Sequence, residues 1–222
     1  MVPSSERARS NPGELPPVAE RVHAPVREGA PPADDRLADA LAQQRATSEI
    51  LSVMVASRTD ATPVFETIAR AALALCRASS AVVATYDGAL LHVGAVASIT
   101  RAGAEAIRCL FPRPASRDNG ITRAVLCRDL VSIPDVLEDP DYATIEPALA
   151  SGFRSVLAIP LVQDGTPIGA ISLGRVAPGA FPDTQVALLR TFADQAVIAV
   201  ENARLFNEIE QRNRDLVETL EQ

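Results

Sequence analysis

Lysine is absent from this chain of 222 residues, and all 21 of its basic residues are arginine. Without lysine the chain cannot form a Schiff base with a carbonyl substrate. It also cannot complete the Gly-Lys-Ser/Thr segment of a phosphate-binding loop. Acidic residues outnumber the arginines and leave a net charge of −7. This balance argues against a general nucleic-acid partner, because nucleic-acid-binding surfaces are strongly basic.

Cysteine and histidine are scarce. Cys76, Cys109 and Cys127 are odd in number and widely spaced. This pattern predicts reduced thiols in a cytosolic protein, and neither a disulfide framework nor a zinc site. The chain has two histidines, no Gly-x-Ser-x-Gly elbow and no metal-ligand spacing. We therefore expect no catalytic activity and no bound metal in this chain.

Long apolar runs are also missing. No stretch approaches the roughly 20 apolar residues that span a bilayer, and no charged-then-apolar signal opens the chain. We expect a cytoplasmic protein with no membrane partner. Residues 1–34 are rich in proline, carry scattered charges and lack any apolar period. This composition predicts a disordered tail, because it cannot bury enough apolar surface to offset the entropy of ordering.

Two apolar runs flank the pair Asp164-Gly165 and predict the central β-hairpin. The runs are 155–162 and 167–176, and Asp-Gly favours the positive φ angles of a tight turn. Both faces of this hairpin are largely apolar, so we expect layers of structure on both sides. A two-residue turn would place Leu161 opposite Ile168, and Arg154 opposite Arg175 at the open end.

The remaining chain predicts helices around a second hairpin, 80–86 and 90–96, whose turn is Asp87-Gly88. Apolar residues at helical spacing predict helices over 36–56, 64–78, 100–110, 121–127 and 183–222, with an extended segment at 130–134 and one helical turn at 148–152. The last helix is apolar around so much of its circumference that it needs a second partner besides the sheet. The predicted fold is α+β, with terminal helices on one face of an antiparallel sheet and a helix-and-loop insert on the other.

This order of elements, and several stretches within it, resemble the GAF domain of bacterial sensory proteins. The stretches are VFETIA (64–69), DNGITRAV (118–125), IPDV (133–136), SGFRSVLAIPL (151–161), PIGAISL (167–173) and LRTFADQAVIAVENARLF (189–206). The resemblance covers about residues 47–222. It implies an N-terminal signalling helix at 35–58, a GAF domain at 59–206, and a helical linker at 207–222 that begins a coiled coil.

The GAF resemblance implies a small-molecule or redox sensor that dimerises through parallel helices. Its last helix would pass a change of shape to an output domain of the histidine kinase or adenylate/guanylate cyclase type. The ligand and any cofactor stay open. A chain without lysine cannot complete the Asn-Lys-Phe-Asp-Glu signature of the members that bind cyclic nucleotides. Cys127 is followed by arginine, so it lacks the Cys-His pair that attaches bilin pigments.

Eight residues are candidates for ligand binding. Phe111, Arg117, Asp118, Ile121 and Ile133 belong to the insert, which would either lid a pocket or simply cap the core. Arg154 and Arg175 would either hold an anion between them or be two solvated ends, since like charges that face each other are destabilising. His92 would be either a ligand-binding residue or a partly buried strand residue with one hydrogen-bond partner.

Three hypotheses for the function follow. The first is a sensory module without catalytic activity of its own, which binds a small molecule between the sheet and the insert. The second, from the enzyme class, is a thiol-dependent reductase of free methionine sulfoxide, since one GAF subgroup uses cysteines in this way. The third is a dimerisation module whose pocket is collapsed.

Overall fold

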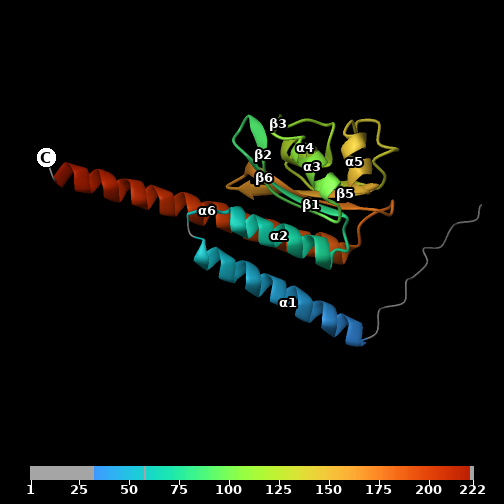
Figure 1. Cartoon of the computed structure of the whole chain (residues 1–222), viewed down its shortest axis with the longest axis horizontal. Helices are drawn as coiled ribbons and strands as arrows, with labels where there is room; N and C mark the ends of the chain where they lie inside the picture. The colour runs from blue at the N-terminus through green and yellow to red at the C-terminus, as the bar shows by residue number, and fades with distance from the viewer. Residues whose placement is uncertain (1–32, 58, 221–222) are drawn as a thin grey trace, which may run out of the picture.

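The computed structural model describes residues 33–57 and 59–220 (Figure 1). In chain order its elements are α1 (Ala33–Ala56), α2 (Thr62–Leu75), β1 (Ser80–Tyr86), β2 (Leu90–Ser98), α3 (Arg101–Arg108), β3 (Arg113–Pro114), α4 (Gly120–Cys127), β4 (Val131–Ile133), α5 (Ile145–Ser151), β5 (Ser155–Gln163), β6 (Thr166–Arg175) and α6 (Asp183–Leu220). The predicted tail, 1–34, lies outside the described residues except for its last two, which begin α1.

The strands form one antiparallel sheet in the order β3-β2-β1-β6-β5-β4. Both predicted Asp-Gly hairpins are confirmed. Asp164 and Gly165 have φ angles of 49° and 79°, and Gly88 has a φ of 98°. The two hairpins meet in the middle of the sheet, where β1 pairs with β6 along most of its length.

The predicted register of the central hairpin is wrong by one residue. Leu161 pairs with Gly169 rather than Ile168, because a bulge lies between Leu161 and Val162. Val162 faces Pro167, which has no N–H to donate, so the ladder is interrupted there and one residue of β6 is left over. Beyond the bulge, Ser155 is opposite Arg175, and Arg154 is not.

The corrected register sorts the side chains of β5 and β6 by size. On one face, which we call the helix face, Leu157 pairs with Leu173 and Ile159 pairs with Ile171. These residues belong to a buried core that also contains residues of α2 and α6. On the other face, Val156 pairs with Gly174 and Ala158 pairs with Ser172. The helix face of the hairpin therefore carries large side chains, whereas the other face carries smaller ones.

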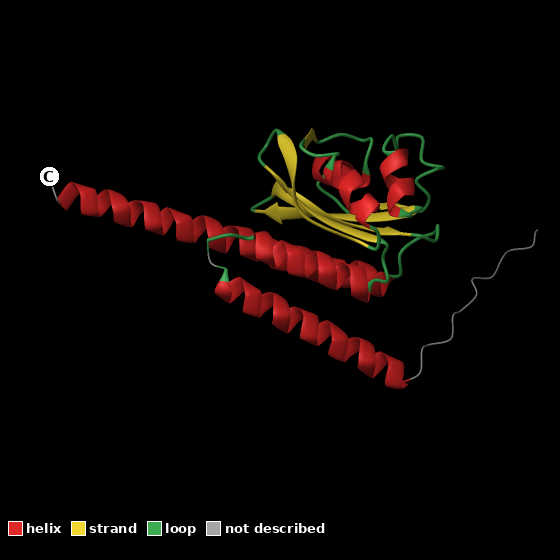
Figure 2. Ribbon diagram, viewed as in Figure 1, coloured by secondary structure: helices red, strands yellow, loops and turns green. Residues whose placement is uncertain are grey.

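Helices cover both faces of the sheet, as predicted (Figure 2). The helices α2 and α6 lie along the helix face, and α1 packs outside them. On the other face lie α3, α4 and α5 with the loops between them, which we call the cover. The face of the sheet beneath the cover is called the cover face. The expected layers on both sides of the central hairpin are present.

Helix α6 packs on the sheet over its first half and then extends away from it (Figure 1). Its buried residues include Leu189, Phe192, Ala196 and Ala199, which belong to the core on the helix face. Helix α2 is the second partner that the broad apolar stripe requires. Among the helices of residues 33–57 and 59–220, none is long and apolar enough to cross a membrane.

Candidate functional site

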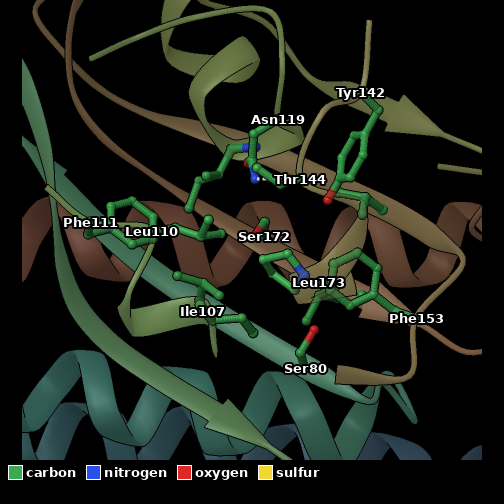
Figure 3. Close-up of a pocket in the computed structure, with 15 residues that line it drawn as sticks. Ser80, Ile107, Leu110, Phe111, Asn119, Tyr142, Thr144, Phe153, Ser172 and Leu173 are labelled. Carbon is green, nitrogen blue, oxygen red and sulfur yellow. Dashed lines mark hydrogen bonds between the residues drawn. The ribbon is translucent and has the colours of Figure 1, made fainter. Parts of the chain in front are cut away.

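A cavity lies between the cover and the cover face of the sheet (Figure 3). Its lining is mostly apolar, with a few hydroxyl and amide groups. The lining residues are Ser80, Val82, Ile107, Leu110, Phe111, Asn119, Ile121, Tyr142, Thr144, Pro147, Phe153, Val156, Ser172, Leu173 and Gly174. The cavity and its mouth enclose about 430 Å³, of which about 30 Å³ can hold the centre of a water molecule. The closed space therefore suits one or two waters, and a larger ligand would have to displace part of the cover.

Small residues on the cover face create this cavity. Ser80 and Gly174 are paired across β1 and β6, and Val82 and Ser172 are the next pair on the same face. A Cβ atom on Gly174 would lie 2.5 Å from the Ser80 Oγ atom and 2.6 Å from the Phe153 ring. Any side chain at this position would therefore fill the space, and glycine leaves it open.

The sheet presents two hydroxyl groups to the cavity, those of Ser80 and Ser172 (Figure 3). Ser80 is 2 % exposed and Ser172 is 9 % exposed. Neither hydroxyl makes a hydrogen bond to any residue in the part of the chain that the structure describes. Burying a hydroxyl without a partner costs roughly 1–3 kcal/mol in proteins, so these two groups are available to a water or a ligand.

The cover contributes a second set of polar side chains to the cavity, and these already take part in hydrogen bonds. The Asn119 side chain caps α4, because its Oδ1 atom accepts a hydrogen bond from the Ile121 N–H at 2.9 Å. Its Nδ2 atom donates to the Thr144 Oγ1 atom at 2.9 Å. Tyr142 lies next to Thr144, and burial raises the pKa of the Tyr142 hydroxyl to about 12. These groups are neutral near pH 7.

No charged side chain lines the cavity among the residues described; charged pairs instead fasten the cover outside it. The Arg123 guanidinium binds both carboxylate oxygens of Asp139, with donor–acceptor distances of 2.8 Å and 3.1 Å. It also donates to the Arg117 carbonyl oxygen. The hydrogen bond from Arg123 holds the pKa of the Asp139 carboxyl below its usual value. This pair joins α4 to the loop before α5.

Further pairs fasten the same loop. Arg117 pairs with Asp141 at 3.2 Å, and Arg154 pairs with Asp135. The hydrogen bond from Arg154 lowers the pKa of the Asp135 carboxyl. The loop that contains Asp135, Asp139 and Asp141 is thus held by arginines of three different segments, and it can retain the cover in one position.

Two of the eight predicted binding residues, Phe111 and Ile121, line the cavity. Ile133 is buried behind the lining, in a cluster with Tyr142, Phe153 and Val156, which do line the cavity. Arg117 and Asp118 take part in ion pairs of the cover, with Asp141 and Arg113 respectively. These three predicted residues support the cavity without facing it.

The other three predicted residues lie away from the cavity. Arg154 is not opposite Arg175 in the ladder, and its guanidinium pairs with Asp135 instead. Arg175 donates to the carbonyl oxygens of Gly179 and Ala180 and lies 4.7 Å from the centre of the Phe181 ring. His92 contacts the Asp87 carboxylate at 2.8 Å beside the β1–β2 turn, so it has the one partner expected of a strand histidine, but it is exposed rather than partly buried.

Sequence reasoning missed the residues of the cavity that carry its polar groups. Ser172 interrupts the otherwise apolar run of β6, and Ser80 begins β1. A hydroxyl in the middle of an apolar strand was the available signal for Ser172. Nothing in the sequence shows that Ser80 lies on the neighbouring strand and faces the same space.

The cysteines do not line the cavity. Cys76 is buried in the core on the helix face, and burial raises the pKa of its thiol to about 11. Cys109 and Cys127 are exposed at the ends of α3 and α4. Within the described part of the chain, no three His, Cys, Asp or Glu side chains come together as a metal site.

The sheet order, the helices on one face and the covered cavity on the other define a GAF-like α+β domain. The sequence profile of the GAF domain family matches residues 60–200. The chain therefore belongs to the GAF domain family. A search of curated proteins finds no match to it.

Solved structures with the same fold come from proteins of different functions. A GAF domain from a phosphoenolpyruvate-protein phosphotransferase of Coxiella burnetii is 13 % identical, with a TM-score of 0.63, over 77 % of this chain and 96 % of that one. A free methionine-R-sulfoxide reductase from Neisseria meningitidis, solved in complex with its substrate, is 21 % identical, with a TM-score of 0.60, over 80 % of this chain and 95 % of that one.

A third similar structure is a domain of a protein described as a two-component sensor histidine kinase from Sinorhizobium meliloti 1021. It is 16 % identical, with a TM-score of 0.52, over 67 % of this chain and 96 % of that one. At these identities the three structures establish the fold of this chain and leave its ligand open.

Proposed function

We propose that this chain is a sensory module that binds a small molecule in the cavity and passes a change of packing to α6, with no catalytic step of its own. The observation that carries the proposal is the double role of β6. Ser172 borders the cavity, and Ile171 beside it packs in the core formed with α2 and α6. A ligand that moves β6 therefore changes the surface on which α6 packs. The ligand shifts the equilibrium between two packings of α6 on the sheet only by the difference between its affinities for them.

A direct contact also joins the central hairpin to α6. The Gln163 amide at the end of β5 donates to the Glu201 carboxylate. Hydrogen bonds from Arg204 and Gln163 lower the pKa of the Glu201 carboxyl to about 2, so the contact keeps its charge near neutral pH. The hairpin tip is thus attached to the point at which α6 leaves the sheet.

The module would act as a cytoplasmic homodimer that controls a kinase or cyclase domain. Leu205 and Ile209 are exposed on α6 and border a groove with Met54 of α1. Exposed apolar groups that form one stripe along a helix are typical of helix–helix contacts. We expect Leu205→Glu to convert a dimer to a monomer in sedimentation velocity, whereas Glu210→Gln on the same helix would not. A monomer at high concentration before mutation would contradict this part of the proposal.

The reductase hypothesis receives less support from the geometry. No cysteine lines the cavity, and the most buried thiol has a raised pKa and little thiolate. We therefore expect no reduction of free methionine sulfoxide by the purified chain with a thiol reductant. Turnover that disappears in the Cys109→Ser and Cys127→Ser variants would restore this hypothesis.

Two measurements test the sensor proposal. Native mass spectrometry of freshly purified protein should detect a retained small molecule, and the Ser172→Val variant, which narrows the cavity, should lose it. Ser132→Val places the same substitution on an exposed position of β4 and should keep it. Hydrogen exchange should show that removing the molecule changes protection in α6. A ligand-free mass, with no thermal shift across a metabolite panel, would favour a ligand-free dimerisation module instead.

A further inference from the structure

The polar groups of the cavity indicate the chemical class of its ligand. Ser80 and Ser172 are each at least nine-tenths buried, and their hydroxyls border the cavity and have no hydrogen-bond partner among the described residues. They lie on the same face of adjacent strands, one pair apart, because Ser80 faces Gly174 and Ser172 faces Val82. Side chains in this diagonal relation are about 7 Å apart or somewhat less. One polar group of a ligand can therefore reach both hydroxyls.

The surrounding surface is apolar. Ile107, Phe111 and Ile121 come from the cover, and Phe153 and Val156 come from the segment that enters β5. These side chains offer no hydrogen bonds to the body of a ligand. An apolar body would gain free energy from contact with them, whereas a polar one would lose its hydration without replacement.

The cavity also lacks a group that could neutralise a charged ligand. The arginines and aspartates of the cover point into ion pairs with one another, including Arg123 with Asp139 and Arg113 with Asp118. Transferring a charge into such a site is costly unless an opposite charge meets it. The Arg113 Nε atom is buried without a hydrogen-bond partner among the described residues, but Arg113 does not line the cavity.

We propose that the ligand is a small uncharged molecule with an apolar body and one hydrogen-bonding group, such as a hydroxyl, carbonyl or amide, which binds between the Ser80 and Ser172 hydroxyls. This inference rests on the proposed function, because it describes the ligand of the same cavity. It excludes nucleotides, carboxylic acids and zwitterionic amino acids, including free methionine sulfoxide. Because such a molecule is larger than the one or two waters for which the closed cavity has room, it displaces those waters and part of the cover as it binds.

Four probes with one carbon skeleton test the ligand class. Benzyl alcohol is uncharged with a hydroxyl, toluene lacks the hydroxyl, benzoate is an anion, and benzylammonium is a cation. The full chain, labelled at its methyl groups, is titrated with each probe and observed by NMR. Benzyl alcohol should shift the methyl signals of Ile107, Ile121 and Val156, which line the cavity. Benzoate and benzylammonium at the same concentrations should not.

Serine variants test the hydrogen-bonding group. Ser80→Ala and Ser172→Ala should each weaken benzyl alcohol by about 3- to 10-fold, the loss expected for one neutral hydrogen bond. Toluene should bind them as well as or better than it binds the original chain. Ser155→Ala is the matched control, because Ser155 is fully buried but its hydroxyl already donates to the Ala177 carbonyl oxygen at 2.9 Å. This control should leave the affinity for benzyl alcohol unchanged.

The outcomes separate this inference from the proposed function. Binding of benzoate or benzylammonium in the cavity, equal binding by the serine variants, or no binding of benzyl alcohol would each overturn the ligand class. If a charged probe binds and also alters hydrogen exchange in α6, the sensor function stands and the ligand class fails. If benzyl alcohol binds through the two serines without any change in α6, the ligand class stands and the sensor function fails.

Discussion

Arg123 and Asp139 form a two-pronged ion pair, in which Nη1 lies 2.8 Å from Oδ2 and Nη2 lies 3.1 Å from Oδ1. Both side chains are largely buried, with 13 % and 17 % of their surfaces exposed. Because Arg123 also donates to the Arg117 carbonyl oxygen, this one side chain joins the loop before α4 to the loop before α5. Separating α4 from the loop before α5 therefore requires this pair to move or to break.

Arg123→Gln should loosen the cover. The substitution leaves the Asp139 carboxylate without its cation, and we expect a loss of about 1–3 kcal/mol in the free energy of unfolding. Denaturant unfolding followed by circular dichroism measures this loss. The double variant Arg123→Gln/Asp139→Asn should recover part of it. Arg101→Gln is the control, because Arg101 pairs with Glu105 on an exposed helix face and should change stability little. Equal effects at Arg123 and Arg101 would contradict the role of the pair.

The Asp139 pair should also make the cover sensitive to acid. Arg123 lowers the pKa of the Asp139 carboxyl in the folded state. The resulting stabilisation is therefore fully present above the unfolded pKa of about 3.9 and is lost as the pH falls through the lowered value. The difference in unfolding free energy between the original chain and Asp139→Asn should be constant near pH 7 and shrink below about pH 4. A difference that persists unchanged down to pH 2 would show that Asp139 does not act through its charge.

The three cysteines should react in two classes. Cys109 and Cys127 are exposed, whereas Cys76 is fully buried and its pKa is raised to about 11 by that burial. At pH 8 a thiol reagent should modify two cysteines quickly and the third only after denaturant is added. Mass spectrometry of the modified peptides identifies the slow residue. Rapid modification of Cys76 in the folded chain would mean that α2 opens readily from the sheet.

Ser80→Ala should be well tolerated in the absence of a ligand. Its hydroxyl has no partner among the described residues, so its removal should change the unfolding free energy by less than about 0.5 kcal/mol or stabilise the chain. Ser155→Ala removes a hydroxyl that donates to the Ala177 carbonyl oxygen at 2.9 Å and should cost about 0.5–1.5 kcal/mol, the net contribution of one hydrogen bond, since that oxygen then keeps only the longer bond of 3.4 Å from Arg175 Nε. Thermal unfolding of both variants makes the comparison. A larger loss at Ser80 than at Ser155 would contradict the view that Ser80 is kept for a ligand.

The local signals in the sequence predicted the elements of this fold. Each Asp-Gly pair defines a turn by its own backbone preference, and the apolar periodicity distinguishes the strands from the helices. The bulge beside Pro167 escaped prediction because it depends on pairing across the hairpin. It places Ser155, rather than Arg154, opposite Arg175.

The cavity was harder to predict than the fold. It exists where small residues of β1 and β6 meet beneath the cover, so it depends on how separated segments come together. Phe111 and Ile121 were found because they belong to the insert that covers the sheet. Ser172 was missed although it interrupts an apolar strand, and Ser80 was missed because nothing in the sequence places it beside Ser172. Arg117 and Asp118 of the insert were predicted to bind a ligand because they are charged, but each forms an ion pair with another residue of the cover.

Under the proposed function, helix α6 would act as a lever arm as well as a packing surface. Its last buried residue, among the side chains described, is Ala203. The remaining segment, 204–220, is about 25 Å long at 1.5 Å per residue. A tilt of only about 5° where α6 rests on the sheet would swing the far end through about 2 Å, the scale of the helix shifts known from switching proteins. A tilt of α6 too small to alter the fold around the cavity would thus move the C-terminal end of the helix by a distance that a neighbouring domain can detect.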